Sequence, residues 1–209
     1  MVKLETIFRN VIEGEDADVE AGVQAALDSG VSPEEILNKA LIAAMDEVGR
    51  RFEADDLFVP EMLIAARAMQ AGLNVLKPHL VESGVQSAAT VAIGTVKGDL
   101  HDIGKNLVAM MLEGAGFEVI DLGTDVDPAK FAEAVRNGAS VVGMSALLTT
   151  TMNNMAQVIE AVEDINMRDK VKIIIGGAPV TAEYAEKIGA DGFAADASSA
   201  VKKVRELLG

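Results

Sequence analysis

The chain has 209 residues, half of them hydrophobic, which is enough apolar material to bury the core of one large domain or two small ones. Its net charge of −15 argues against a nucleic-acid partner, because phosphate binding needs clustered lysine and arginine side chains. Cysteine is absent, which excludes disulfides, thiolate metal sites, iron–sulfur clusters and cysteine nucleophiles. The sequence shows no leader-like segment and no membrane-spanning apolar run, so we expect a cytoplasmic protein that does not engage membranes.

The first 84 residues show the pattern of a small helical bundle. Apolar residues at helical spacing predict a first helix from Leu4 to Ile12, and a second from Asp16 to Asp28. Ser32 followed by Pro33 is typical of the start of a third helix, with serine as the N-cap and proline in the first turn. A fourth helix should begin at Pro60. The pattern therefore favours an all-helical first half.

From residue 88 onward, strand and helix patterns alternate. Strands are predicted at Thr90–Gly94, Glu118–Leu122, Ser140–Ser145, Lys172–Ile175 and Gly192–Ala195. Helices are predicted at Ile103–Ala115, Pro128–Asn137, Thr151–Asn166, Ala182–Ile188 and Ser198–Leu208. This alternation predicts a five-stranded parallel sheet in a flavodoxin-like or Rossmann-like α/β domain, with its ligand at the carboxyl ends of the strands. We therefore predict two domains, residues 1–84 and 88–209, joined by a polar linker at 82–87.

One loop carries the most chemical information. Residues 94–106 leave the first predicted strand at its carboxyl end and include His101, one of only two histidines. Asp99 can orient one ring nitrogen of His101 while the other binds a metal, and the glycines of this loop allow a bulky ligand to come close. The glycine spacing is neither a dinucleotide fingerprint nor a Walker loop, so it gives little support to nucleotide binding. On its own, such a histidine is more often a hydrogen-bonded structural residue, and that interpretation stays open.

Three short motifs, in this order along the chain, resemble a known family. The run at residues 99–104 is similar to the D-x-H-x-x-G signature of cobalamin-binding domains of the methionine synthase and methylmalonyl-CoA mutase type. Residues 145–147 and 176–177 are similar to the S-x-L and G-G elements of those domains. Residues 57–63 resemble the helical cap module that precedes the corrinoid domain in methyl-carrier proteins. The resemblance covers essentially the whole chain, and it implies a helical cap followed by a cobalamin-binding α/β domain.

The resemblance implies a role for each matching residue. His101 would be the lower axial ligand of cobalt, replacing the corrinoid's own base in the base-off, His-on mode. Asp99 would accept a hydrogen bond from the far nitrogen of His101, and Thr151 would extend this relay where methionine synthase has serine. These three residues would be the catalytic set, with His101 as the metal ligand. The implied corrinoid-binding set is Gly98, Asp99, His101, Asp102, Ile103, Gly104, Ser145, Leu147, Thr149, Gly176, Gly177, Phe193 and Ala194, with Met62 of the cap as a shield for the upper face.

The resemblance also implies a methyl-carrier subunit rather than a complete enzyme. A substrate:corrinoid methyltransferase would methylate the cobalt, and a second methyltransferase would pass the methyl group to tetrahydrofolate or coenzyme M. A reductive activase is expected as a further partner. The cap would have to move aside to expose the cobalt, with residues 82–87 as the hinge. The partner selects the methyl donor, so the sequence of this chain does not identify it.

Three other functions stay open. The cobalamin-binding subunit of an adenosylcobalamin mutase shares the signature, although the helical first half fits a methyl carrier better. A cobalamin-sensing regulator would need a DNA-binding module, to which so acidic a chain is poorly suited. A flavodoxin-like FMN or signalling domain would leave the run at residues 99–104 unexplained, and aromatic residues make up only 3% of the chain, few for stacking a flavin ring.

Overall fold

The computed structural model describes residues 4–83 and 89–209, which belong to two compact units. The helical unit comprises residues 1–87 with 113–116, and the α/β unit comprises 88–112 with 117–209. Most of the predicted linker, residues 84–87, lies outside the described residues. Within the described ranges, no helix is both long enough and apolar enough to cross a membrane.

The helical unit consists of amphipathic helices that share one core. Its segments are α1 (Leu4–Glu13), α2 (Asp16–Asp28), α3 (Pro33–Ile36), the π-helical η1 (Leu37–Ile42), α4 (Ala43–Glu53) and α5 (Val59–Glu82). Ser32 caps α3 as predicted, because its Oγ accepts a hydrogen bond from Glu35 N at 3.2 Å. The predicted third helix continues from α3 through η1 into α4. The core side chains include Ile7, Val19, Leu41, Met45, Met62 and Met69.

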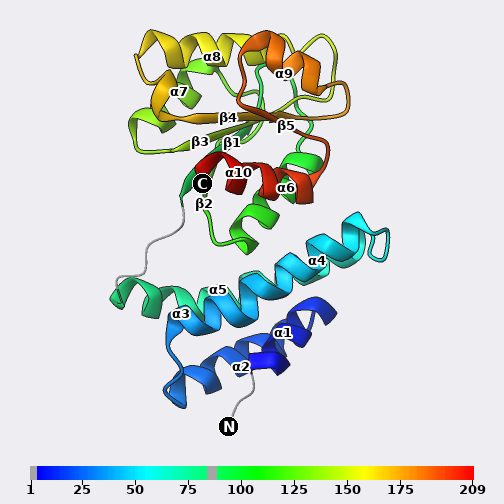
Figure 1. Cartoon of the computed structure of the whole chain (residues 1–209), viewed down its shortest axis with the longest axis vertical. Helices are drawn as coiled ribbons and strands as arrows, with labels where there is room; N and C mark the ends of the chain where they lie inside the picture. The colour runs from blue at the N-terminus through cyan, green and yellow to red at the C-terminus, as the bar shows by residue number, and fades with distance from the viewer. Residues whose placement is uncertain (1–3, 84–88) are drawn as a thin grey trace. The chain divides into compact units, whose positions relative to one another are not determined.

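The α/β unit confirms the predicted five-stranded parallel sheet. Its strands are β1 (Thr90–Thr95), β2 (Glu118–Asp121), β3 (Val141–Ser145), β4 (Lys172–Gly176) and β5 (Gly192–Ala194), in the order β2-β1-β3-β4-β5. Its helices are α6 (Ile103–Gly114), α7 (Pro128–Arg136), α8 (Asn154–Asp164), α9 (Ala182–Ile188) and α10 (Ala197–Leu208), with the 3-10 turn η2 (Arg168–Lys170) before β4. Helices α7, α8 and α9 cover one face of the sheet, and α6 and α10 cover the other (Figure 1).

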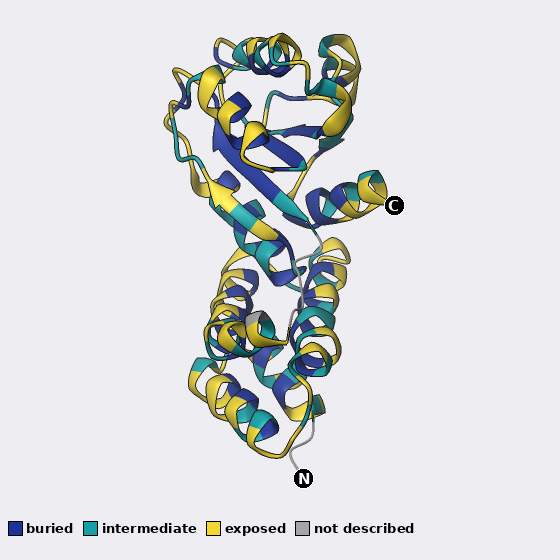
Figure 2. Cartoon of the chain, turned by 90° about the vertical axis from the view of Figure 1, so that its left-hand side faces the viewer, coloured by how far each residue is buried: buried dark blue, intermediate teal, exposed yellow. Residues whose placement is uncertain are grey.

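The central strands β1, β3 and β4 form the buried centre of the α/β unit (Figure 2), whereas β2 is mostly exposed. Strands β1 and β3 are buried along almost their whole length, as expected for parallel strands with helices on both faces. On the face below α7 and α8, the core includes Phe131, Met155, Ile173 and Ile175, all nearly inaccessible to solvent. This packing fixes the strand ends from which the loops of the site leave.

The strand order changes direction at β1, which lies between β2 and β3. At the carboxyl ends of β1 and β3, Thr95 is paired with Ser145, and Val96 N donates to Ser145 O at 3.0 Å. The loops that follow these two strands therefore start side by side. In doubly wound α/β folds, ligands bind at this position, outside the carboxyl ends of the strands.

Candidate functional site

The loop after β1 begins with a tight turn. Asp99 N donates to Val96 O at 3.1 Å, and Gly98 between them has φ +81°, a left-handed conformation that favours glycine. The turn brings Asp99 back beneath the loop that follows β3, where Asp99 is completely buried. The adjacent residues Leu100 and His101 remain exposed, so the loop is fixed at Asp99 and accessible to solvent at Leu100 and His101.

The Asp99 carboxylate connects the predicted relay residues. Its Oδ1 accepts from the His101 ring at Nδ1 (2.7 Å) and from His101 N (3.1 Å). Its Oδ2 accepts from Thr151 Oγ1 (2.6 Å) and from Leu147 N (2.8 Å). The structure thus places the three residues of the predicted catalytic set in one hydrogen-bonded chain, with Thr151 buried at its inner end.

The hydrogen bonds to Asp99 determine its charge. Burial by itself raises the pKa of Asp99, because it penalises the charged carboxylate. The Thr151 hydroxyl, the His101 ring and the backbone N–H groups of Leu147 and His101 outweigh this effect and hold the pKa well below its usual range. Asp99 is therefore a carboxylate over the whole neutral pH range, and it favours the His101 tautomer with a proton on Nδ1.

The second ring nitrogen of His101 is left for a ligand. The His101 side chain is 52% exposed, and no group in the described ranges hydrogen-bonds to Nε2. With the proton on Nδ1, Nε2 carries a lone pair that can bind a metal ion. No group of three or more His, Asp or Glu side chains that could form a metal-binding cluster occurs among the described residues. A metal held here would therefore have to bring most of its ligands with it.

Large apolar side chains are exposed on the two segments that meet at Asp99 and His101. Leu100 is 73% exposed and Ile103 81%, and across the edge Leu147 and Leu148 are each 43% exposed. Such a concentration of exposed apolar side chains is typical of a binding surface. Gly104 extends it, since a Cβ on this residue would meet nothing within 4 Å. Among the glycines whose surroundings are described, Gly104 alone combines open space with a φ outside the left-handed range.

The glycine pair at the end of β4 has a reason within the domain. Gly177 has φ +124°, and a Cβ there would lie 1.9 Å from Ala146 O. A Cβ on Gly176 would lie 2.8 Å from Ala194 O. These glycines let the chain segments after β3, β4 and β5 come close together, a structural role that is independent of their predicted part in corrinoid binding.

The structure places the remaining predicted residues as follows. Asp102 is exposed, and its Oδ2 accepts from Asn106 Nδ2 at 3.1 Å. Thr149 is exposed on the loop after β3, whereas in β5 Ala194 is buried and Phe193 is half-buried against the core. Met62 belongs to the other unit and is fully buried in the helical core.

Sequence reasoning missed several residues that hold the loop. The Thr95 hydroxyl, fully buried, donates to His101 O at 2.8 Å. The Lys105 ammonium, only 1% exposed, donates to both carboxylate oxygens of Asp121 at 2.6 Å. Burial by itself raises the pKa of Asp121, but the hydrogen bonds from Lys105 and from the Gly123 N–H outweigh this effect, so the pKa lies below its usual value. The sequence offered two signals for these residues: Thr95 is a polar residue in an apolar strand, and Lys105 is a charged residue in an apolar helix.

The loop after β3 is also fixed from behind. The hydroxyl of Tyr184, on α9, donates to Met152 O at 2.9 Å, next to Thr151. Asn154, at the start of α8, donates from Nδ2 to Lys97 O at 2.7 Å. Helix α8 therefore begins at Asn154, three residues later than predicted, because the preceding residues form the turn that presents Thr151 to Asp99.

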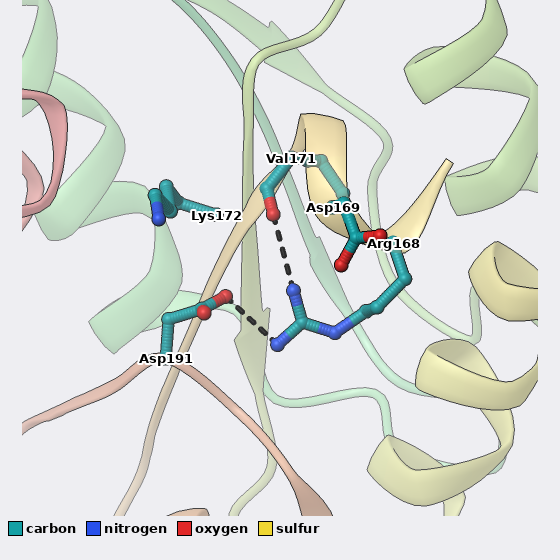
Figure 3. Close-up of a pocket in the computed structure, with 5 residues that line it drawn as sticks. All are labelled: Arg168, Asp169, Val171, Lys172 and Asp191. Atoms are coloured by element: carbon teal, nitrogen blue, oxygen red, sulfur yellow. Dashed lines mark hydrogen bonds and ion pairs between the residues drawn. The ribbon is translucent and has the colours of Figure 1, made fainter. Parts of the chain in front are cut away.

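A polar hollow of about 330 Å³ lies at the opposite edge of the sheet, at the amino ends of β4 and β5 (Figure 3). It is lined by Arg168, Asp169, Val171, Lys172 and Asp191. Arg168 donates to Val171 O and forms an ion pair with Asp191 at 2.9 Å (Figure 3). Asp191 also accepts from Ile173 N at 2.7 Å. Arg168 and Asp191 thus bond to each other and to the backbone, as expected of a structural feature.

Comparison with known proteins agrees with this geometry. Two models described as "B12 binding domain" match residues 89–205 and 3–77. Trimethylamine corrinoid protein 1 of Methanosarcina acetivorans is 44% identical over 96% of this chain and 94% of its own length. The dimethylamine corrinoid protein of Methanosarcina barkeri is 48% identical over 85% of this chain and 84% of its own.

Solved structures agree as well. A cobalamin-binding protein from Desulfitobacterium hafniense is similar with a TM-score of 0.81 and 30% identity, covering all of both chains. The methanol:cobalamin methyltransferase complex MtaBC of Methanosarcina barkeri contains a chain similar with a TM-score of 0.83 and 29% identity, over 98% of this chain and 79% of that one. The fold and the site thus define a cobalamin-binding protein of two units. The chain belongs to the family of B12-binding corrinoid proteins.

Proposed function

We propose that this protein carries a methyl group on the cobalt of a corrinoid bound through Nε2 of His101. The observation that supports this most strongly is the environment of His101. Its Nδ1 is bonded to a buried carboxylate, its Nε2 is free, and apolar side chains are exposed on the two segments that meet there. A corrinoid fits this arrangement, because it supplies the other ligands of its cobalt and presents a broad, largely apolar face.

The residues present also fit the size of such a ligand. Gly104 leaves open space beside His101 where other residues would place a Cβ. Leu100 on the same loop and Ile103 at the start of α6 offer apolar surface, and covering it would be favourable by roughly 25 cal/mol per Å² buried. When bound, the corrinoid would supply the chemistry, in which cobalt accepts and releases a methyl group. The protein would bind it, orient it and exclude water from its lower face.

The Asp99–His101 pair would tune the bond to cobalt. A carboxylate on Nδ1 makes the opposite nitrogen a better electron donor. Thr151 and Leu147 N hold that carboxylate in its charged form, so the donor strength of His101 depends on residues of two loops.

Two methyltransferases and a reductive activase are the partners that we propose. The relatives named for trimethylamine and dimethylamine, and the methanol:cobalamin methyltransferase complex, support a substrate methyltransferase as the first partner. We propose a methylated amine as the donor class, because the relatives at 44–48% identity carry those names. In a methylation assay with amine- and methanol-specific methyltransferases, faster transfer from the methanol enzyme would contradict this assignment.

The absorption spectrum of protein reconstituted with hydroxocobalamin tests the central proposal. We expect the wild type to retain the corrinoid with an altered spectrum, and His101→Ala to lose that alteration. His79→Ala is the matched control, since His79 lies on α5 in the other unit and is the only other histidine. Retention of the same spectrum in His101→Ala would refute ligation by His101, and failure of the wild type to retain corrinoid would refute the carrier function.

A further inference from the structure

Asp125 lies in the segment between β2 and α7, outside the motifs that identify the family. Its backbone is left-handed, with φ +52°, a conformation that residues with a Cβ adopt rarely. Among the described residues other than glycine, only Asp55 and Asn166 share it. Such an outlier persists only where the surrounding structure holds it in place, and it often marks a functional constraint.

Asp125 grips the loop that carries His101. Its Oδ1 accepts from Gly98 N at 2.7 Å, and its own N–H donates to Asp99 O at 2.9 Å. The two hydrogen bonds therefore bracket the two-residue segment that contains Asp99. The acceptor is charged and the first distance is short, which makes that hydrogen bond stronger than a neutral one.

The loop needs such support from outside. Gly98, with φ +81°, gives the backbone before Asp99 more freedom than any other residue would. On the side of β3, the Asp99 side chain is held by Leu147 N and Thr151. On the side of β2, the backbone on either side of Asp99 is held by Asp125. The Asp99 carboxylate is thus held from the side of β3, and the backbone that carries it from the side of β2.

We propose that Asp125 is a positioning residue for His101. By holding the backbone at Gly98 and Asp99, it aims Asp99 Oδ1 at Nδ1 of the histidine and so leaves Nε2 free toward the ligand. The inference rests on the proposed function for the identity of that ligand. The geometry of the histidine itself belongs to the protein alone and can be measured without a corrinoid.

Three variants separate the side-chain bond from the backbone conformation. Asp125→Gly keeps the left-handed backbone at no steric cost and removes the acceptor oxygen. Asp125→Asn keeps an acceptor oxygen and is also tolerated in this conformation. Asp55→Gly is the matched control, because it makes the same change at another exposed, left-handed aspartate, in the loop after α4.

Two measurements on the full chain report the outcome. The first is the pair of ¹⁵N chemical shifts of the His101 ring without corrinoid, at a pH above the usual pKa of histidine, which gives the tautomer. The second is the affinity for cobinamide, a corrinoid without a base of its own. Because cobinamide has no base of its own, any axial nitrogen coupling in the paramagnetic resonance spectrum of the bound Co(II) form arises from the protein, which verifies that the measured affinity includes ligation.

We expect Asp125→Gly to populate both tautomers of His101 and to bind cobinamide roughly tenfold more weakly, at the low end of the 10–100-fold loss typical of such supporting partners. Asp55→Gly should match the wild type in both measurements, and Asp125→Asn, which keeps an acceptor oxygen but loses its charge, should lie between Asp125→Gly and the wild type. Unchanged ring shifts and affinity in Asp125→Gly would overturn the proposal. An affinity lost together with thermal stability while the ring shifts stay unchanged would also overturn it. If wild-type protein failed to bind cobinamide while Asp125→Gly still altered the tautomer, the proposed function would fail and the positioning role would stand.

Discussion

The two edges of the sheet treat their charged residues in opposite ways. At the amino edge, Arg168 bonds to Asp191 and to backbone oxygens, and Asp191 also accepts from Ile173 N, so the groups satisfy one another. At the carboxyl edge, Asp99 is fully satisfied, but it directs its bonds so that one nitrogen of His101 is left over. A hollow is present at the first edge, yet the incomplete bonding is at the second.

This contrast teaches that a hollow can be lined by groups that already satisfy one another, whereas unsatisfied bonding capacity on a rigid support can occur elsewhere on the same sheet. At the amino edge, removing either Arg168 or Asp191 would leave the other without its charged partner. The carboxyl edge keeps its rigid, buried parts beneath and its free nitrogen and apolar side chains above. Mutations at the two edges should therefore separate stability from binding.

Asp99→Asn should give the largest effect. An amide can accept at one oxygen but turns its own N–H groups toward donors, so it loses either the His101 bond or the Thr151 and Leu147 bonds. We expect cobinamide affinity to fall 10–100-fold and the free energy of unfolding to fall by about 2 kcal/mol. Calorimetric titration and urea unfolding measure the two. An affinity within twofold of the wild type would contradict a role for Asp99 in corrinoid binding.

Asp191→Ala, at the amino edge, should lower stability without changing corrinoid binding. It leaves Arg168 without its ion pair and Ile173 N without an acceptor, which should cost about 2 kcal/mol of the free energy of unfolding. Cobinamide affinity should not change, because no predicted site residue bonds to Asp191. Urea unfolding and the same titration provide the test, and a loss of affinity in the folded variant would show that the edges are coupled.

Gly104→Ala should move stability and binding in opposite directions. Alanine is the better helix former, and the added methyl group meets no atom of the protein, so the free energy of unfolding should rise by about 0.5 kcal/mol. A ligand lying on this surface would be pushed away, lowering cobinamide affinity by roughly tenfold, or about 1.4 kcal/mol. Equal affinities for the variant and the wild type would place the ligand elsewhere.

Thr151→Val and Thr151→Ser test the inner end of the chain of hydrogen bonds. Valine removes the hydroxyl that donates to Asp99 Oδ2 at 2.6 Å, which should cost about 1 kcal/mol of the free energy of unfolding. Serine keeps the donor and should preserve the coordination of the corrinoid. The axial nitrogen coupling of Co(II) cobinamide, compared between the two variants, is the deciding measurement. Identical couplings in valine and serine variants would exclude a relay.

Acid should produce the smallest effect. The pKa of Asp99 is depressed in the folded protein, so its stabilising contribution is complete above the unfolded pKa of about 3.9 and is lost as the pH falls through the folded pKa. Glu47 acts in the same direction, because Arg50 and Arg51 lower its pKa from 4.5 to about 2. Urea unfolding between about pH 6 and pH 3 should therefore show a shallower decline in Asp99→Asn than in the wild type. Equal slopes would contradict the depressed pKa.

Much of the fold could be predicted because the relevant signals are local. Apolar runs identified all five strands to within two residues, and for β1, β3 and β4 the reason is that strands buried along most of their length have few other compositions available. The cap at Ser32 followed from its neighbours alone. The π-helical segment at Leu37–Ile42 was not predicted, because one widened turn leaves the apolar spacing nearly unchanged.

The candidate site was predictable only where a motif marks it. Asp99, His101 and Thr151 were named from the resemblance, and the structure joins them by hydrogen bonds. Thr95 and Asp125 act on backbone atoms of the loop, and backbone contacts between distant segments leave no pattern in a single sequence. Positive φ at a non-glycine residue is likewise visible only in three dimensions.

The position of Tyr184 has an optical consequence. It is the only tyrosine in a chain without tryptophan, so it supplies nearly all of the intrinsic ultraviolet fluorescence. Its hydroxyl is fixed to Met152 O, next to Thr151, which ties this one fluorophore to the loop beneath the proposed corrinoid. Because corrinoids absorb strongly in the near ultraviolet, occupancy of the site should dim the tyrosine emission. The natural chain would then report its own loading without any attached label.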